Sequence, residues 1–190
     1  SNSGKIKVSM KDGTTITFDG SEVFLSPADS KYAKSKARFD IFTWQYFFAL
    51  PYKLSDPGTN WKVLGTKKMG AQHYQAGRLT FGKDIGDAPD DWYVVYADPE
   101  NHLIQAAAYI VTFSQSATEA SKDPHAIIYK DYQTIQGVPV ATTWEFTGWN
   151  EETGIKGKLG NATLSNIKFI SAAEANFEVP ENSVKVDREG

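Results

Sequence analysis

Hydrophobic and polar residues alternate with a period of two along most of this chain. In residues 5–10, KIKVSM, every second side chain is apolar and the others are lysine or serine. Such alternation is typical of a half-buried β-strand. Asp12-Gly13 follows this segment and predicts a hairpin turn to the next strand. That strand, within TTITFDGSEVFL, is interrupted at Asp19-Gly20, which predicts either a turn or a bulge.

The same alternation returns after residue 60 and predicts three further hairpins. Their turns are expected at Met69-Gly70, at residues 98–101 (DPEN) and at residues 136–139 (QGVP). The strand over residues 92–97 is apolar on both faces, which predicts a central strand that is covered on both sides.

The C-terminal part of the chain gives weaker signals. Residues 154–161, GIKGKLGN, hold three glycines and are interpreted as a flexible hairpin loop. A last strand is expected near residues 163–170. The tail, residues 178–190, is polar and is expected to be partly disordered beyond Pro180. The total is about eight to ten antiparallel strands, and the lack of a βα alternation argues against a parallel sheet.

Residues 33–50 break the strand pattern. Six aromatic residues lie between Phe39 and Phe48. Two apolar stripes of helical spacing cover most of the circumference, which predicts one long, buried helix. Pro51 disfavours helical geometry at the preceding residue, so the helix is expected to end at Leu50. The sequence therefore predicts a single α+β domain over residues 1–190, mainly β, in which a curled antiparallel sheet, an incomplete β-barrel, packs around an aromatic helix.

The composition limits the functional classes. The net charge is −3, from 23 acidic and 20 basic residues, and gives no electrostatic footprint for nucleic acid. The absence of cysteine removes disulfides and thiol nucleophiles. No apolar run approaches the roughly 18 residues of a membrane-spanning helix. The chain begins SNSGKIKV without an initiating methionine, so no leader is visible, and this start is interpreted as that of either a mature or a truncated chain.

No catalytic, metal or cofactor motif emerges from the polar residues. The carboxylates of KDIGDAPDDW, which are Asp84, Asp87, Asp90 and Asp91, do not have the spacing of a calcium loop and are interpreted as a turn with solvated charges. The three histidines lie far apart in the sequence, without the spacing of a zinc site. An enzyme would require polar groups that converge, such as Asp131 or Glu145 with a histidine. We therefore predict no catalytic residues, no metal and no cofactor.

Two segments together carry a resemblance to a known family. YFFALPYKLSDPG followed by LTFGKDIGDAPDDWYVVYADPENHLI resembles an uncharacterised, Bacteroidetes-type family of bacterial envelope proteins, and the similarity covers roughly residues 38–170. That family is related in fold to the lipoprotein-carrier group typified by LolA and LolB. Those carriers are similar to an incomplete antiparallel β-barrel whose apolar cavity takes lipid acyl chains. The resemblance implies a half-barrel of this type in the periplasm or the outer-membrane-associated envelope, with a lipid or lipoprotein ligand.

The leading hypothesis is a non-enzymatic protein that binds or carries an apolar ligand in the concave face of the half-barrel. Six aromatic residues are expected to line the apolar cavity: Trp44, Phe47, Phe48, Tyr93, Tyr109 and Phe113. The alternative is a structural or protein-interaction module with a solid core, in which exposed aromatic residues such as Trp149, Trp61 or Tyr32 form a contact patch. A membrane-surface association and the oligomeric state are left open.

Overall fold

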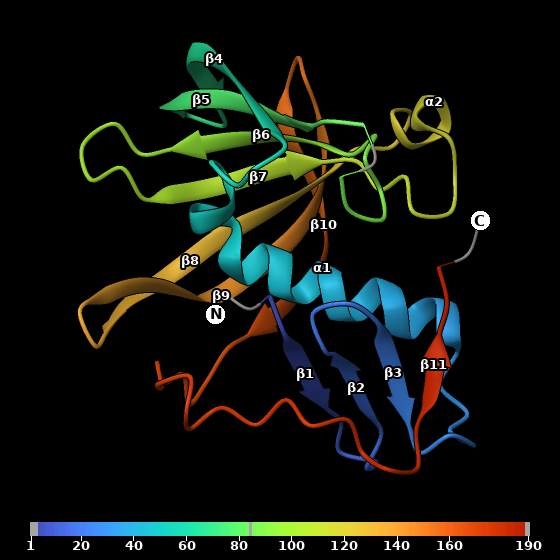
Figure 1. The fold of residues 1–190 in the computed structure, drawn as a ribbon. Coiled ribbons are helices and arrows are strands. Elements are labelled where there is room, and N and C mark those ends of the chain that lie inside the picture. The colour runs from blue at the N-terminus through green and yellow to red at the C-terminus, as the bar shows by residue number, and fades with distance from the viewer. Residues whose placement is uncertain (1–3, 84, 189–190) are drawn as a thin grey trace. The chain divides into compact units, whose positions relative to one another are not determined.

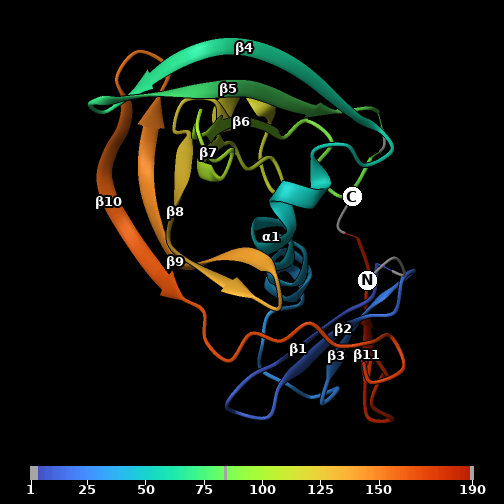
Figure 2. The ribbon, with the colours of Figure 1, turned by 90° about the vertical axis from the view of Figure 1, so that its left-hand side faces the viewer.

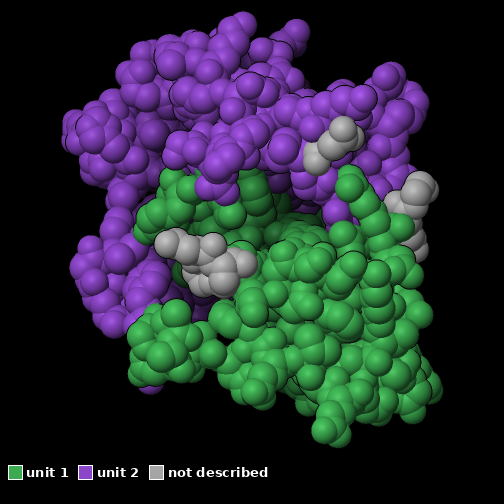
Figure 3. Space-filling model, in the orientation of Figure 1, with its two compact units in different colours: residues 1–53, 170–190 green, residues 54–169 purple. Residues whose placement is uncertain are grey.

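The computed structural model describes residues 4–83 and 85–188. The chain divides into two compact units, coloured separately in Figure 3: residues 1–53 with 170–190, and residues 54–169. The described residues form eleven strands and two helices, in two antiparallel sheets where the sequence predicted one. The mainly β architecture is confirmed, and the single domain over residues 1–190 stays a prediction.

The first unit holds a four-stranded sheet in the order β1-β2-β3-β11. Its strands are β1 (Ile6–Ser9), β2 (Thr15–Phe18), β3 (Val23–Ser26) and β11 (Val184–Val186). The predicted hairpin after β1 is confirmed, with Gly13 at a φ of 89°. The interruption at Asp19-Gly20 is a turn rather than a bulge. Asp19 Oδ1 accepts hydrogen bonds from the backbone amides of Ser21 and Glu22, both at 2.8 Å, and these bonds close the turn.

Helix α1 (Lys34–Lys53) packs against one face of this sheet, as Figure 1 shows. The apolar residues of the alternating strands form a core with the helix. Its buried members are Ile16, Val23, Leu25, Ala37, Ile41 and Val186. The helix is not buried all round, because Trp44 is 43% exposed. Neither described helix is long and apolar enough to cross a membrane.

The predicted end of this helix at Leu50 is wrong, because the helix continues to Lys53 with Pro51 in its last turn. A proline at this point removes one backbone donor, whose partner would be the carbonyl of Phe47. Only two helical residues follow Pro51, so little of the helix depends on the interrupted bond, and the proline costs less there than in the middle.

The C-terminal segment completes the first unit. Val184–Val186 pair with β3, so the expected disorder beyond Pro180 is wrong for these residues. Upstream of β11, the segment is tied to the sheet by two hydrogen bonds that its carbonyls accept. Lys7 Nζ donates to Glu178 at 2.8 Å and Ser26 Oγ donates to Asn182 at 2.9 Å.

The second unit is a seven-stranded meander in which each strand pairs with its neighbour in the sequence. Its strands are β4 (Thr59–Met69), β5 (Gln72–Phe81), β6 (Trp92–Ala97), β7 (Ile104–Tyr109), β8 (His125–Ile135), β9 (Val138–Asn150) and β10 (Gly154–Thr163), with the short helix α2 (Ala117–Ala120) before β8. The sheet is strongly curved, as the arch of β4 and β5 in Figure 2 shows. It is not closed into a barrel, since β4 and β10 are its edges. The three predicted hairpins are confirmed.

Two predictions for the C-terminal part of this sheet are wrong. Residues 154–161 belong to strand β10, and residues 164–170, expected to form most of a last strand, form none. The register between β9 and β10 shifts on both sides of Lys158, and these irregularities destroy the period of two on which the prediction depended.

One face of the seven-stranded sheet has its own core. Its buried members come from six strands: Met69, Tyr74, Ala76, Val94, Tyr96, Ala106, Ala108, Ala126 and Trp149. Trp149 reaches across β7 and β8, and its Nε1 donates a 3.2 Å hydrogen bond to the hydroxyl of Tyr96. Only alanines of this cluster lie on β7 and β8, which leaves room for both rings. Trp149 is 4% exposed, so its predicted place in an exposed contact patch is wrong.

Candidate ligand-binding face

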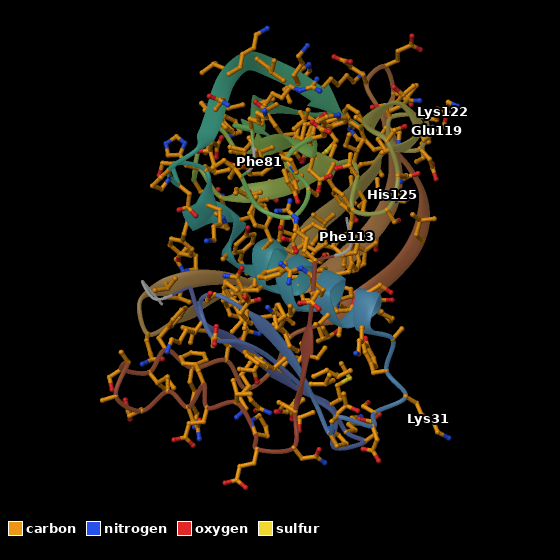
Figure 4. All side chains as sticks on the ribbon, turned by 45° about the vertical axis from the view of Figure 1, so that its right-hand side comes forward. Lys31, Phe81, Phe113, Glu119, Lys122 and His125 are labelled. Atoms are coloured by element: carbon orange, nitrogen blue, oxygen red, sulfur yellow. The ribbon has the colours of Figure 1, made fainter. Side chains whose placement is uncertain are left out.

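The opposite face of the seven-stranded sheet carries a row of aromatic rings, which we call the aromatic row. It consists of Phe81 on β5, Tyr93 on β6, Tyr109 on β7 and His125 on β8. Successive ring centroids are 6.2, 6.0 and 6.1 Å apart. Figure 4 labels both ends of the row, Phe81 and His125. The row therefore spans four adjacent strands.

The strand register explains why these rings meet. Tyr93 lies directly opposite Tyr109, and Tyr109 directly opposite His125. Phe81 is two residues beyond Leu79, the partner of Tyr93, and so contacts Tyr93 diagonally. Cross-strand aromatic pairs of this kind contribute roughly 0.2–1 kcal/mol each to sheet stability. The period of two in the sequence thus becomes a continuous row once the hairpins fix the register.

Aliphatic residues form the next row on the same face. Val95, Ala107 and Ile127 pair in sequence across β6, β7 and β8, and each is at most 3% exposed. Further along, the rings of Tyr129 on β8 and Trp144 on β9 pack edge to face, with their centroids 6.2 Å apart. This face of the sheet is therefore apolar over at least two rows.

Tyr109 of the aromatic row is uncharged at neutral pH. Burial raises the pKa of the Tyr109 hydroxyl to about 12, so the phenol stays protonated. His125, at the end of the row, lies with Nε2 at 3.5 Å from Oδ2 of Asp123. A surface made mainly of aromatic rings suits an apolar ligand better than an ionic one.

A carboxylate fastens the loops next to the aromatic row. Oδ1 of Asp91, just before β6, accepts hydrogen bonds from the backbone amide of Thr112 at 2.7 Å and from its hydroxyl at 2.8 Å. Burial raises the pKa of Asp91 to about 6, against the opposing effect of these two bonds. The interpretation of this carboxylate as a solvated charge is therefore wrong. Asp84 lies outside the described residues.

The sequence-predicted site residues fall into two sets. Tyr93 and Tyr109 lie side by side and are 8% and 7% exposed. Phe113, labelled in Figure 4, follows β7 in a loop and is partly buried. These three belong to the second unit.

The other three predicted residues lie on α1, in the first unit. Trp44 and Phe47 contact each other with ring centroids 6.5 Å apart, and Phe47 is 3% exposed. Phe48 is partly buried. That the two sets line one apolar cavity stays a prediction.

The strand register excludes one pair of candidate catalytic residues, Glu145 with His125. Glu145 lies opposite Ile128, whereas His125 lies three residues earlier on β8, opposite Gly148. Residues three apart on a strand point to opposite faces of a sheet, so these two side chains cannot converge. Glu145 instead bonds Lys130 at 3.1 Å and Lys158 at 3.3 Å. In residues 4–83 and 85–188, no group of three or more histidine and acidic side chains could hold a metal ion.

Sequence reasoning missed three residues of this region. Phe81 and His125 were not assigned to the site, although both lie in segments where apolar and polar residues alternate. Only the strand register shows that their rings extend the row of Tyr93 and Tyr109. Asp91 gave no signal of its own, because its partner Thr112 is 21 residues away in the sequence.

Comparisons with known proteins place the sequence in a family. The model of a group described as "Family of unknown function (DUF6503)" matches residues 16–164, more than half of the chain. No curated protein matches the sequence. The fold is similar to the crystal structure of a LolA superfamily protein from Nitrosomonas europaea, with a TM-score of 0.44 and 13% identity, over 82% of this chain and 68% of that chain. The predicted membership of an uncharacterised family is confirmed.

Proposed function

The chain belongs to this family of unknown function, and we propose that it is a non-enzymatic protein that binds an apolar ligand against the aromatic row. The ligand class is an acyl chain, carried on a lipid or a lipoprotein. The proposed contacts from the second unit are Tyr93 and Tyr109 of the sheet and Phe113 of the loop after β7. The helix residues Trp44, Phe47 and Phe48 form the other part of the proposed site. The proposed location is the bacterial cell envelope, in the periplasm or at the outer membrane.

The observation that supports the proposal is that both faces of the seven-stranded sheet are apolar. One face is filled by the core that joins Trp149 to Tyr96. The other face presents a second apolar surface, with the ring of Tyr93 next to that of Tyr109 and no carboxylate in the aromatic row. A sheet with two apolar faces must cover both, and an acyl chain can supply part of that cover.

Apolar burial alone gives a useful affinity. Each buried methylene contributes about 0.8 kcal/mol, so about ten of them contribute about 8 kcal/mol, equivalent to a dissociation constant on the order of micromolar. Because this contribution is non-directional, we expect weak discrimination among acyl chains of similar length. Hydrogen-bonding groups on the ligand would add little.

The test is native mass spectrometry of the protein after mild purification, followed by displacement of a fluorescent fatty-acid probe. We expect mass adducts that organic extraction releases as lipid, and probe binding with a micromolar dissociation constant. Phe113→Ala should weaken probe binding, because it removes one proposed contact. Tyr109→Phe should leave it unchanged, because it keeps the ring.

The matched control is Phe169→Ala, which removes the same side chain from a position that is 38% exposed and lies outside the aromatic row. Equal effects of the two Phe→Ala variants would show that loss of binding reflects general destabilisation. Absence of both adducts and probe binding in the unmodified protein would refute the proposal.

The alternative function is a structural or protein-interaction module with a solid core. The low exposure of Tyr93 and Tyr109, 8% and 7%, favours it, because rings that are already buried need no ligand to cover them. This module would bind no probe and yield no lipid on extraction. The same two measurements therefore separate the two functions.

A further inference from the structure

The segment of residues 59–83, which contains β4 and β5 and which we call the basic hairpin, is positively charged. It holds Lys62, Lys67, Lys68, Arg78 and Lys83 and not one acidic residue, in a chain whose net charge is −3. The acidic excess therefore lies elsewhere in the chain. Although the net charge of the chain is negative, this segment is locally positive and attracts anions.

The lysines of the basic hairpin are available to a partner. Lys62, Lys67, Lys68 and Lys83 are all exposed. Within the part of the chain that the structure describes, none of the four forms an ion pair or a side-chain hydrogen bond. Arg78 differs, because its guanidinium stacks on the ring of Trp92 at 4.6 Å.

Strand β4 also carries exposed apolar side chains, on the face opposite that of Lys62. Trp61 and Val63 lie two residues apart on one face of β4 and are 45% and 73% exposed. The indole of Trp61 rests on Gly77 of β5, where a Cβ would lie 1.9 Å from its Cζ2. A glycine is therefore required under the ring, which holds the indole flat and leaves its outer side open to solvent.

The position of β4 narrows the choice of partner. β4 is the outermost strand of its sheet, so side chains from both of its faces border this edge; β10 lies against its last residue, where a Cβ on Gly154 would be 3.7 Å from Cα of Met69. The register shift between Val63 and Gly65 and the three lysines are features that oppose pairing with another strand. An added peptide strand therefore fits this edge poorly. The edge suits a negatively charged surface better, because such a surface needs no backbone pairing and can accept an indole ring.

We propose that the basic hairpin docks on an anionic lipid surface. Lysines contact lipid phosphates, and Trp61 with Val63 enters the boundary between headgroups and acyl chains, where tryptophan is enriched in membrane proteins. This inference uses none of the residues of the aromatic row, although Trp61 lies on the same face of the sheet, opposite Leu79, the partner of Tyr93.

Vesicle co-sedimentation tests the inference. The probes are vesicles of phosphatidylcholine alone and vesicles with 30% phosphatidylglycerol, chosen for this experiment as roughly the anionic content of a charged leaflet. We expect binding to the anionic vesicles only, and its loss at about 1 M salt, where the Debye length falls to about 3 Å. Each lysine near such a surface strengthens binding to the vesicle about fivefold. The combined variant Lys62→Gln, Lys67→Gln and Lys68→Gln should therefore bind roughly 100-fold more weakly.

A second triple variant controls for total charge. Lys11→Gln, Lys31→Gln and Lys34→Gln remove three exposed lysines of the other unit, of which Lys31 is labelled in Figure 4. This variant should bind anionic vesicles as the unmodified protein does. Equal losses in the two triple variants would overturn the proposal, because net charge rather than the basic hairpin would then govern binding.

The apolar contribution has its own control. Trp61→Ala should weaken vesicle binding by roughly tenfold, whereas Leu159→Ala, at a 63% exposed position on the opposite edge strand, should not. Binding of equal strength to neutral vesicles would overturn the proposal. So would binding of polyglutamate through the three lysines without any binding of vesicles, since the partner would then be an acidic protein.

Discussion

Replacement of Asp91 by asparagine should remove a dependence of folding stability on pH. The carboxylate of Asp91 fastens Thr112 through two hydrogen bonds, and burial raises its pKa from the ordinary value of 3.8 to about 6. A raised pKa means that the folded protein holds the proton more tightly than the unfolded chain does. Between about pH 4 and about pH 6 the folded state therefore binds more protons, and the free energy of unfolding falls as the pH rises.

The size of this effect follows from the two pKa values. Each pH unit between them corresponds to about 1.4 kcal/mol. For a pKa of about 6 against 3.8, stability should fall by about 3 kcal/mol in total, with about 2 kcal/mol of this between pH 4 and pH 6, and should level off above about pH 7 as far as this group is concerned. Asparagine keeps a side-chain oxygen as an acceptor for Thr112 and carries no proton to lose. The substitution should therefore flatten the profile and stabilise the protein at pH 7.

Urea denaturation followed by tryptophan fluorescence, at several pH values from 4 to 7, measures the difference. Other titrating groups cancel when Asp91→Asn is compared with the unmodified protein at each pH. A second variant, Thr112→Val, removes the hydroxyl that donates to the carboxylate, so it should raise the pKa of Asp91 further and lower stability at pH 7 by about 1–3 kcal/mol. If the unmodified protein and Asp91→Asn change in parallel between pH 4 and pH 7, burial of this carboxylate has been misjudged.

Two further experiments test the packing of the seven-stranded sheet. Gly77→Ala would place a Cβ 1.9 Å from Cζ2 of Trp61, so the indole must leave the sheet; we expect red-shifted fluorescence and a loss of about 1 kcal/mol, and an unchanged spectrum would contradict this arrangement. Trp149→Phe and Tyr96→Phe each break the buried 3.2 Å hydrogen bond between them. In a double-mutant cycle measured by urea denaturation the coupling energy should be about 1 kcal/mol, and a value near zero would show that the bond adds nothing to stability.

Local signals in the sequence predicted the hairpins well. Glycine-containing turns such as Met69-Gly70 join strands that alternate, and both features are encoded within a few residues. Strand β10 was missed because its pairing with β9 tolerates register shifts, which hide the period of two. The second sheet was missed because Val184–Val186 is too short to give a pattern and pairs with a strand near the other end of the chain.

The candidate site was predictable to a similar degree. The apolar character of Tyr93 and Tyr109 follows from the alternation, and their contact follows from the hairpin between β6 and β7. The continuation of the row to Phe81 and His125 depends on the register of further strands. The bond from Asp91 to Thr112 depends on where two loops meet, which no short segment of sequence specifies.

The pairing of β11 with β3 has a consequence for the order of folding during synthesis. Every strand of the seven-stranded unit pairs with its neighbour in the sequence, so this unit can form hairpin by hairpin as the chain leaves the ribosome. The four-stranded sheet cannot, because one edge of β3 has no partner until Val184–Val186 has been translated. The unit whose first strands are made earliest is therefore the last to be completed.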